Sequence, residues 1–435
     1  MVETTHMQPR ISDAVRNRIA FVIFIAQSFF SASVIAAFTL SPIIATALSG
    51  SEASAGFPNT LGLVGRAAFA YPFGYLMDQL GRRLALSGGY GLGVLGALTS
   101  VWAVMNNSYA GFLAGALLLG MSRAASDQSR YVAAEIYPTV RRAKVIGWIV
   151  FAGTAGAIFG PLLVAPSGNF LRQFDFADQI ATWSGPFAVA AIALLLGTLT
   201  LFFFLRPDPL VLGQQVAQDE AKADVNSVEN TTETRSISEI FSAPLVQIAV
   251  LSMVLGYFIM AFLMVITPVH MDNHNHGTMA ISGVIAAHTM GMFGLSGLTG
   301  WLIDRFGRIT MIYAGVAVLI AGCITAPLST QIPILGLALF LIGLGWNFAF
   351  VSGSSLLSDA LNTRERARGQ AASEVLVALA TGLASFTVGS VFQAGDYITV
   401  SLIGFALTVT LGVLTFLLYR KHRNLSNMAT PFPAD

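Results

Sequence analysis

Charged residues are scarce in this chain. Only 10% of its 435 residues are Asp, Glu, Lys or Arg, whereas soluble domains average about 25%. Cys323 is the only cysteine, so neither an intrachain disulfide nor a thiolate metal site can form. The chain also lacks a G-x-x-x-x-G-K-[ST] phosphate loop, an H-E-x-x-H zinc motif and a G-x-S-x-G nucleophile turn. We therefore expect no soluble fold, no enzyme, no cofactor, no metal and no nucleic-acid partner.

Apolar residues dominate instead. They make up 55% of the chain, and a bilayer core of about 30 Å needs about 20 apolar residues per helix. Apolar runs between polar or turn-rich breaks predict twelve membrane-spanning helices. The predicted spans are 19–48, 57–78, 85–105, 109–132, 145–166, 184–205, 243–269, 279–303, 309–328, 331–358, 370–393 and 397–419. The expected fold class is an all-α protein embedded in the lipid bilayer.

The longest polar break separates two groups of six spans. Residues 206–241 are rich in Asp, Glu, Asn, Ser and Thr and show no apolar periodicity before Ile237. This composition is typical of a flexible linker. We expect an N-terminal six-helix bundle at 1–206, a cytoplasmic linker at 207–241, and a C-terminal six-helix bundle with a cytoplasmic tail at 242–435.

Basic residues are unevenly distributed between the two sides of the predicted membrane. Of the 23 Lys and Arg residues, all but Arg66, Arg123 and Arg172 belong to the termini and the loops on their side. Loops that stay in the cytoplasm carry an excess of basic residues. Both termini are therefore predicted to be cytoplasmic, and the chain to be a multi-pass protein of the inner (plasma) membrane.

Two segments of the chain repeat each other at one constant spacing. The run Gly74-Tyr-Leu-Met-Asp78-Gln-Leu-Gly81-Arg82 recurs 226 residues later as Gly300-Trp-Leu-Ile-Asp304-Arg-Phe-Gly307-Arg308. The same offset carries Arg142 onto Arg368. A parallel repeat of six helices is a known transporter construction, with the substrate site between the two halves near the membrane midplane. We expect two pseudo-symmetric bundles.

The repeated run, with Arg83 after its first copy, resembles the loop 2–3 signature of the major facilitator superfamily (MFS), and the second copy resembles the loop 8–9 counterpart. Gln79 stands where the family often has a basic residue. The resemblance covers nearly the whole chain and implies the MFS fold. It also implies that these loops connect the halves in one state and separate in another; a purely topological role for the basic residues is the alternative. The expected gating residues are Gly74, Asp78, Gly81, Arg82, Arg83, Gly300, Asp304, Gly307 and Arg308.

A second resemblance lies in the fifth span. Gly147, Gly156, Gly160 and Pro161 are similar in spacing to a signature of proton-driven exporters of the superfamily, although Val164 replaces its last glycine. Small residues at this spacing also let two helix backbones pack closely. The pattern therefore indicates either an antiporter of the drug:proton type or ordinary helix packing.

Arg66, Arg123 and Asp127 fall inside predicted spans. A charge near the bilayer centre costs at least about 2.5–3.5 kcal/mol, so it should face a cavity or a partner. Arg123 and Asp127 are spaced to form an ion pair on one helix face, and Arg66 could attract an anionic substrate group. We consider these residues, with Gln27 and Asn347, candidates for proton or substrate binding. Static ion pairs and ordinary bundle contacts are the alternatives.

Four of the six histidines gather around the end of the seventh span and the eighth span: His270, His274, His276 and His288. Three hypotheses account for them. They could bind a metal ion together with Asp272, His288 could exchange a proton, or they could be hydrogen-bonded helix-end and core residues.

The sequence thus predicts a secondary transporter that works as a monomer, with a small-molecule substrate and protons as its partners. Efflux by alternating access is favoured, on the fifth span alone. Proton-coupled uptake of a metabolite and a non-transporting membrane sensor are the alternatives.

Overall fold

The chain folds into helices throughout its described length. The computed structural model describes residues 12–172, 182–223 and 235–429. The first half contains α1 (Asp13–Ser49), η1 (Glu52–Ser54), α2 (Phe57–Met105), α3 (Tyr109–Glu135), α4 (Thr139–Arg172), α6 (Gly185–Phe204) and α7 (Pro209–Ala223). The second half contains α8 (Ile237–Ser242), α9 (Pro244–Asn273), α10 (Thr278–Thr289), η2 (Met290–Gly294), α11 (Ser296–Phe306), α12 (Arg308–Thr325), α13 (Ile332–Ala360) and α14 (Thr363–Ala429).

Twelve membrane spans follow from these helices, as predicted. Eight helices are long and apolar enough to cross a membrane, and α10 and α11, bent by 42° at their junction, form a ninth span. Two of these eight helices, α2 and α14, each contain two spans, because α2 breaks at Gly81 and α14 breaks at Gly395 and Asp396. This gives eleven spans. The twelfth span is α3, whose 27 residues include four charged side chains.

The internal repeat is visible in the backbone. Gly81 (φ 83°, ψ 165°) and Gly307 (φ 84°, ψ 158°) adopt the same conformation, which favours glycine. Each glycine is followed by an arginine that pairs with a carboxylate near the end of another helix: Arg82 with Glu135 at 3.1 Å and Arg308 with Asp359 at 2.9 Å. The two halves therefore repeat a turn and its ion pair, as two pseudo-symmetric bundles require.

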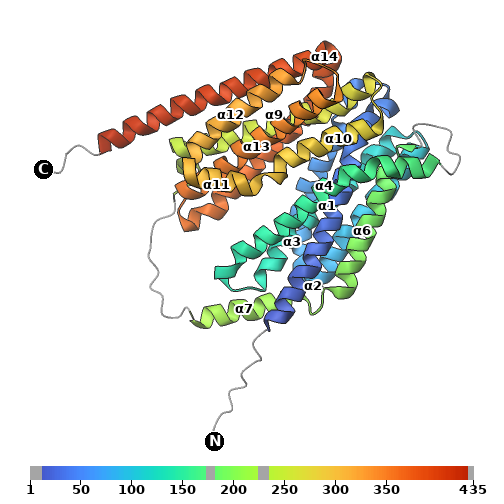
Figure 1. Cartoon of the computed structure of the whole chain (residues 1–435). Helices are drawn as coiled ribbons and strands as arrows, with labels where there is room; N and C mark the ends of the chain where they lie inside the picture. The colour runs from blue at the N-terminus through green and yellow to red at the C-terminus, as the bar shows by residue number, and fades with distance from the viewer. Residues whose placement is uncertain (1–11, 173–181, 224–234, 430–435) are drawn as a thin grey trace, which may run out of the picture.

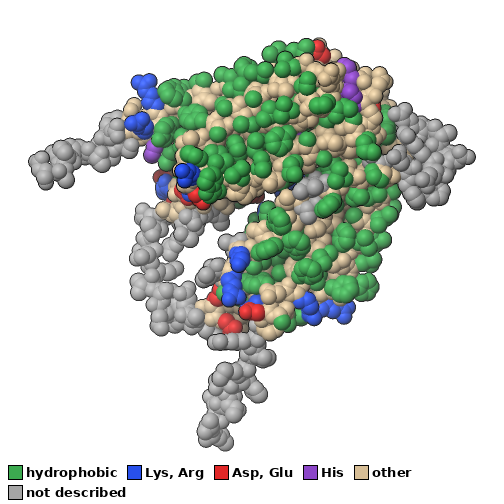
Figure 2. Space-filling view, viewed as in Figure 1, with side chains coloured by type: hydrophobic (Ala, Val, Ile, Leu, Met, Phe, Trp, Pro, Cys, Tyr) green, Lys and Arg blue, Asp and Glu red, His purple; other side chains and the backbone are tan. Residues whose placement is uncertain are grey.

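The two bundles meet at one end and separate at the other (Figure 1). We call the end with α7, Gly81 and Gly307 the terminal end, because both chain termini leave from it, and the other the opposite end. Contacts between the halves join α1 to α9, α4 to α10, and α14 to η1 and α2. Figure 2 shows hydrophobic side chains over the faces of both bundles and Lys and Arg at the terminal end. The structure is therefore open at the terminal end.

The expectation of an unstructured linker is wrong over two stretches. Residues Pro209–Ala223 form α7, which packs on α2 and α3, and Glu220 of α7 pairs with Arg142 at 2.8 Å. The short helix α8 begins with a capping box formed by Ser236 and Glu239. Local composition did not reveal these helices because docking on a bundle, rather than propensity, stabilises most helices in proteins.

A buried carboxylate fixes the start of the second half. Glu365 is 1% exposed, and its carboxylate accepts hydrogen bonds from the Arg235 guanidinium at 2.7 and 2.9 Å and from the Arg235 backbone at 3.0 Å. These bonds hold the pKa of Glu365 at about 2, below its ordinary value of 4.5. Arg235 thus attaches the linker to the start of α14.

We predict that Glu365→Gln lowers the melting temperature at pH 7 by several degrees, because Arg235 loses its charged partner. A carboxylate with a depressed pKa stabilises the fold fully above pH 4.5, and its contribution is lost as the pH falls toward about 2. The difference from the wild type should therefore shrink over that range in a thermal melt. Asp304→Asn, at an exposed position, is the control and should melt like the wild type at each pH.

Candidate functional site

Glycines close the opposite end between the bundles. A Cβ on Gly56 would overlap the carbonyl oxygen of Ser385 on α14, and a Cβ on Gly389 would lie 2.5 Å from the carbonyl oxygen of Ala53. The side chain of Asn59 hydrogen-bonds Ser385, and the rings of Phe57 and Phe386 stack with centroids 5.3 Å apart. Backbone thus rests directly on backbone here, which leaves no room for a solute to pass.

This contact ends about one helical turn before the charged residues. On α2, Thr60 donates to the carbonyl of Gly382 at 3.4 Å, and a Cβ on Gly382 would lie 3.7 Å from Leu63 Cδ1. The next position facing inward is Arg66, whose Nε lies 2.5 Å from Asp127 Oδ2 on α3. Both side chains stay about one-third exposed, at 36% and 29%. An ion pair therefore lies at the closed base of the cleft.

The predicted pairing of Arg123 with Asp127 is wrong. Asp127 binds Arg66 of the neighbouring helix instead, because Gly65 lets α2 approach the backbone of α3 at Leu117 and so brings Arg66 beside Asp127. Arg123 is exposed and lies near Arg66, Asp127 and Tyr257. Two arginines therefore share one carboxylate.

The second half contributes aromatic rings and one acid. Tyr257 on α9 lies near the charged residues Arg123, Arg66, Asp127 and Glu374. It packs edge-on against Trp346 and Phe350 of α13, with centroids 5.0 and 5.2 Å away. Glu374, on the first part of α14, is exposed. The charged base of the cleft thus faces an aromatic cluster across the boundary between the bundles.

Glu374 was missed in the sequence, although the signal was present. It is an acid inside the predicted span 370–393, and an ionisable residue within a span is by default a functional candidate.

Two other candidates are hydrogen-bonded within their own halves. The Gln27 side chain accepts from Tyr90 at 3.1 Å and from Ser126 at 2.9 Å. Asn347 is 1% exposed and donates to Ser296 at 3.1 Å and to the Met292 carbonyl in the irregular turn η2. Asn347 therefore satisfies a backbone group that the bend between α10 and α11 leaves free. For both residues a binding role stays a prediction.

The histidines do not form a metal centre. Among the residues that the structure describes, no group of three or more His, Cys, Asp or Glu side chains could hold a metal ion. His270 stacks on Tyr397 at 4.1 Å, and His276 hydrogen-bonds the Thr330 carbonyl at 2.7 Å. His288 is fully buried, with Nδ1 2.8 Å from the carbonyl oxygen of Leu339 on α13. The described residues therefore give the metal hypothesis no support, and a proton role for His288 stays a prediction.

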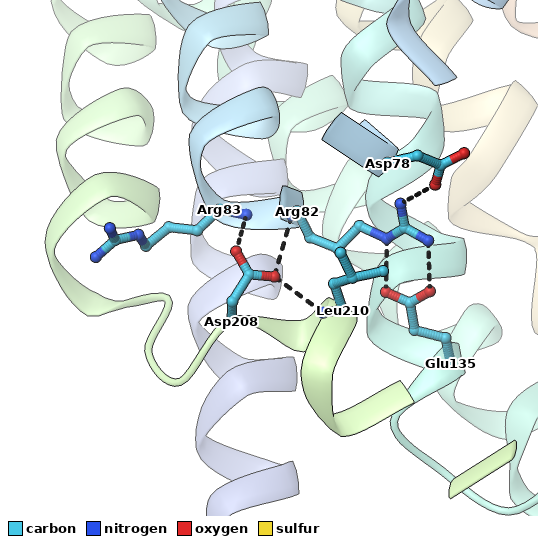
Figure 3. Close-up of polar contacts among 6 residues, drawn as sticks. All are labelled: Asp78, Arg82, Arg83, Glu135, Asp208 and Leu210. Atoms are coloured by element: carbon cyan, nitrogen blue, oxygen red, sulfur yellow. Dashed lines mark hydrogen bonds and ion pairs between the residues drawn. The ribbon is translucent and has the colours of Figure 1, made fainter. Parts of the chain in front are cut away.

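The loop motif of the first half is held within that half (Figure 3). Arg82 binds Asp78 at 2.7 Å and Glu135 at 3.1 Å. The Asp208 carboxylate accepts from the backbone N–H groups of Arg82 and Arg83 at 3.0 and 3.1 Å, where the second part of α2 begins. It thereby caps that helix, as an acid at a helix N-terminus does.

This capping explains why glycine occupies position 81. A Cβ there would lie 2.6 Å from Asp208 Oδ2. Neither Glu135 nor Asp208 was among the predicted residues, because both lie more than 50 positions from Arg82. Burial raises the pKa of Glu135 even though Arg82 opposes that shift.

In the second half, Arg308 pairs with Asp359, while Asp304 is exposed. Gly74 and Gly300 each precede the turn of their own half and have open space where a Cβ would stand. The motifs thus lie at the same end of the two bundles. Their action as a connection between the halves stays a prediction, because the bundles are apart at this end.

Two of the predicted glycines of the fifth span are packing positions. A Cβ on Gly156 would overlap the α1 backbone at Ala32, and one on Gly160 would lie 2.8 Å from the Ala32 carbonyl oxygen. Ser31 donates to the Gly153 carbonyl at 2.7 Å. Pro161 is buried nearby, whereas Gly147 has open space around it. Gly156 and Gly160 thus allow α4 to pack closely against α1.

Comparisons with known proteins agree with this architecture. The sequence matches the Major Facilitator Superfamily over residues 20–385 and 250–432. It is 35% identical to the uncharacterized MFS-type transporter YdeG of Bacillus subtilis (strain 168), over 94% of this chain and 95% of that protein. It is 26% identical to the riboflavin transporter RfnT of Brucella anthropi, over 91% and 95% of the two chains.

Among solved structures, the fold resembles a bacterial homologue of the human lysosomal transporter Spinster in an inward-facing and occupied conformation. The TM-score is 0.70 at 14% identity, covering 94% of this chain and 98% of that one. It also resembles a D-xylose-proton symporter, with a TM-score of 0.66 at 17% identity, covering 91% and 97%.

Proposed function

The chain belongs to the major facilitator superfamily and is a multi-pass membrane transporter of that family; we propose that it couples the movement of a small organic solute to protons through Asp127. The observation that carries this proposal is one carboxylate bound to Arg66 and close to Arg123 at the closed base of the cleft. A proton on Asp127 would break its ion pair and leave two arginines facing the cleft.

Charge balance favours a proton and solute that bind together. With Asp127 ionised, Arg66 is occupied; with Asp127 neutral, both arginines are free to bind an anionic group or stack on an aromatic ring. The partly exposed rings of Tyr257 and Phe350 add an apolar wall. We therefore propose uptake of an anionic or aromatic solute together with a proton. With a neutral solute, the proton carries one elementary charge, which supplies about 2.3 kcal/mol per 100 mV. With a monovalent anion the net charge moved is zero, so the pH gradient alone drives transport.

Alternating access follows from the end that is closed. Release toward the terminal end needs no rearrangement, because the bundles are apart there. Entry from the opposite end requires the contacts of Gly56 and Gly389 to separate. By the excess of basic residues, we propose that the terminal end faces the cytoplasm of a bacterial cell, that both chain termini lie there, and that the protein works as a monomer in the inner membrane.

Export by exchange, as in drug:proton antiporters, is the second candidate. It rests on the glycine spacing of the fifth span, two members of which pack against α1. In this case a proton and the solute would compete for the same site instead of binding together.

Vesicles with radiolabelled riboflavin as the first probe separate the two directions. An inward proton gradient across right-side-out vesicles should drive accumulation that a protonophore abolishes, if solute and proton move together. Accumulation only in everted vesicles with protons inside would instead support export. If riboflavin is not carried, a panel of anionic and aromatic metabolites and drugs takes its place. Proton-independent flux for every carried compound would contradict coupling.

A further inference from the structure

A groove lies between the terminal ends of α1 and α4, away from the cleft residues described above. Its volume is about 660 Å³, and its apolar walls include Phe21 and Phe24 of α1 and Trp148 of α4. Phe21 is 61% exposed and Trp148 is 56% exposed. These two large rings are therefore exposed on the surface of the bundle. Further along, at Ala32 and Gly156, the two helices pack closely and the groove ends.

Charge is confined to one end of the groove. Arg141 and Lys144 line it near the start of α4, while Phe24 lies seven residues beyond Asn17 on α1. At 1.5 Å per residue the groove extends about 10 Å from its basic mouth into the span. The ion pair that Arg141 forms among the described residues is an exposed contact of 3.7 Å with Asp13, which contributes little. Among the described residues, Lys144 makes no ion pair.

We propose that this groove binds an anionic phospholipid, with its phosphate at Arg141 and Lys144 and an acyl chain along Phe21, Phe24 and Trp148. The combination of cations and apolar rings favours an anionic lipid as the occupant. A free phosphate would leave the rings uncovered, and a neutral lipid would leave the two cations without a partner. Basic pockets between membrane helices on the side of the anionic leaflet recognise lipid headgroups in this way.

Trp148 reports directly on the occupant. In variants with a single tryptophan, brominated lipid quenches the indole that it touches. Trp148 should be quenched more strongly by brominated phosphatidylglycerol than by brominated phosphatidylcholine in vesicles of otherwise identical phosphatidylcholine. Trp102, also 56% exposed but at the opposite end of the first half, is the matched position and should be quenched equally by both.

Arg141→Gln/Lys144→Gln should abolish this preference. Loss of both cations lowers the affinity for phosphatidylglycerol about 25-fold, which corresponds to about 2 kcal/mol at about 1 kcal/mol per charge. Arg420→Gln/Lys421→Gln removes the same charge at the exposed end of α14 and should keep the preference. The ratio of phosphatidylglycerol to phosphatidylcholine that co-purifies with the protein carrying all its tryptophans should change in parallel. Equal quenching of Trp148 by the two lipids, or a preference that survives loss of Arg141 and Lys144, would overturn the proposal.

Discussion

Gly56→Ala is expected to leave the transporter unable to close its opposite end. The added Cβ would overlap the Ser385 carbonyl oxygen, and a backbone atom cannot rotate away as a side chain does. Overpacking a tight contact costs about 1–3 kcal/mol, so the population closed at this end should fall about 5–150-fold. Because the backbones touch directly, we expect the upper part of that range.

Thiol labelling measures this population without a known substrate. Replacing the buried Cys323 by alanine gives a cysteine-free background, in which Leu63→Cys places one thiol next to Gly382 at the base of the cleft. A membrane-impermeant reagent added at the opposite end should label this thiol much faster once Gly56 is alanine. Gly277→Ala is the matched control, because Gly277 lies at the same end with open space where its Cβ would stand. Equal labelling of the two alanine variants would show that the contact at Gly56 does not control access.

Asp127→Asn should reduce proton-coupled transport to the level of empty vesicles. The amide cannot gain or lose a proton at the pH of the assay, and it leaves Arg66 and Arg123 without their carboxylate. An unpaired charge near the bilayer centre costs at least about 2.5–3.5 kcal/mol, and partial exposure to the cleft lowers that figure for Arg66. We therefore expect a lower melting temperature as well as the loss of coupling.

Combining Arg66→Gln with Asp127→Asn distinguishes the two effects. The double variant removes both members of the pair, so it should recover stability relative to Asp127→Asn while its transport stays absent. Asp127→Glu keeps a titratable carboxyl and should retain coupling. Proton-driven accumulation that persists in Asp127→Asn would contradict the assignment of the proton to this residue.

The spans and the repeat could be predicted because their causes are local. Apolar runs of about 20 residues reflect the thickness of the bilayer, and Gly81 and Gly307 are required by a backbone conformation that other residues rarely adopt. The break of α2 at Gly81 therefore falls between the predicted spans 57–78 and 85–105. Arg66 and Asp127 were candidates for the same kind of reason, since a charge inside an apolar run is visible in the sequence.

The partners of these residues could not be predicted in the same way. Spacing along one helix suggested Arg123 for Asp127, whereas the observed partner depends on how closely Gly65 lets α2 approach α3. Glu135 and Asp208 come from other elements of the chain and meet Arg82 only after folding. The helix α7 was missed because its stability comes from docking rather than from composition.

The ion pair formed by the arginine after each glycine turn indicates how the two halves diverged. Arg82 and Arg308 stand 226 residues apart, whereas their partners Glu135 and Asp359 stand 224 apart. If the halves arose by duplication of one ancestral unit, the cation kept its place while the acid moved by two positions near the helix end. If the position of the acid can shift in this way, the strength of the ion pair can change in one half without changing in the other. A symmetric ancestor could thereby acquire two halves whose loops need different free energies to open.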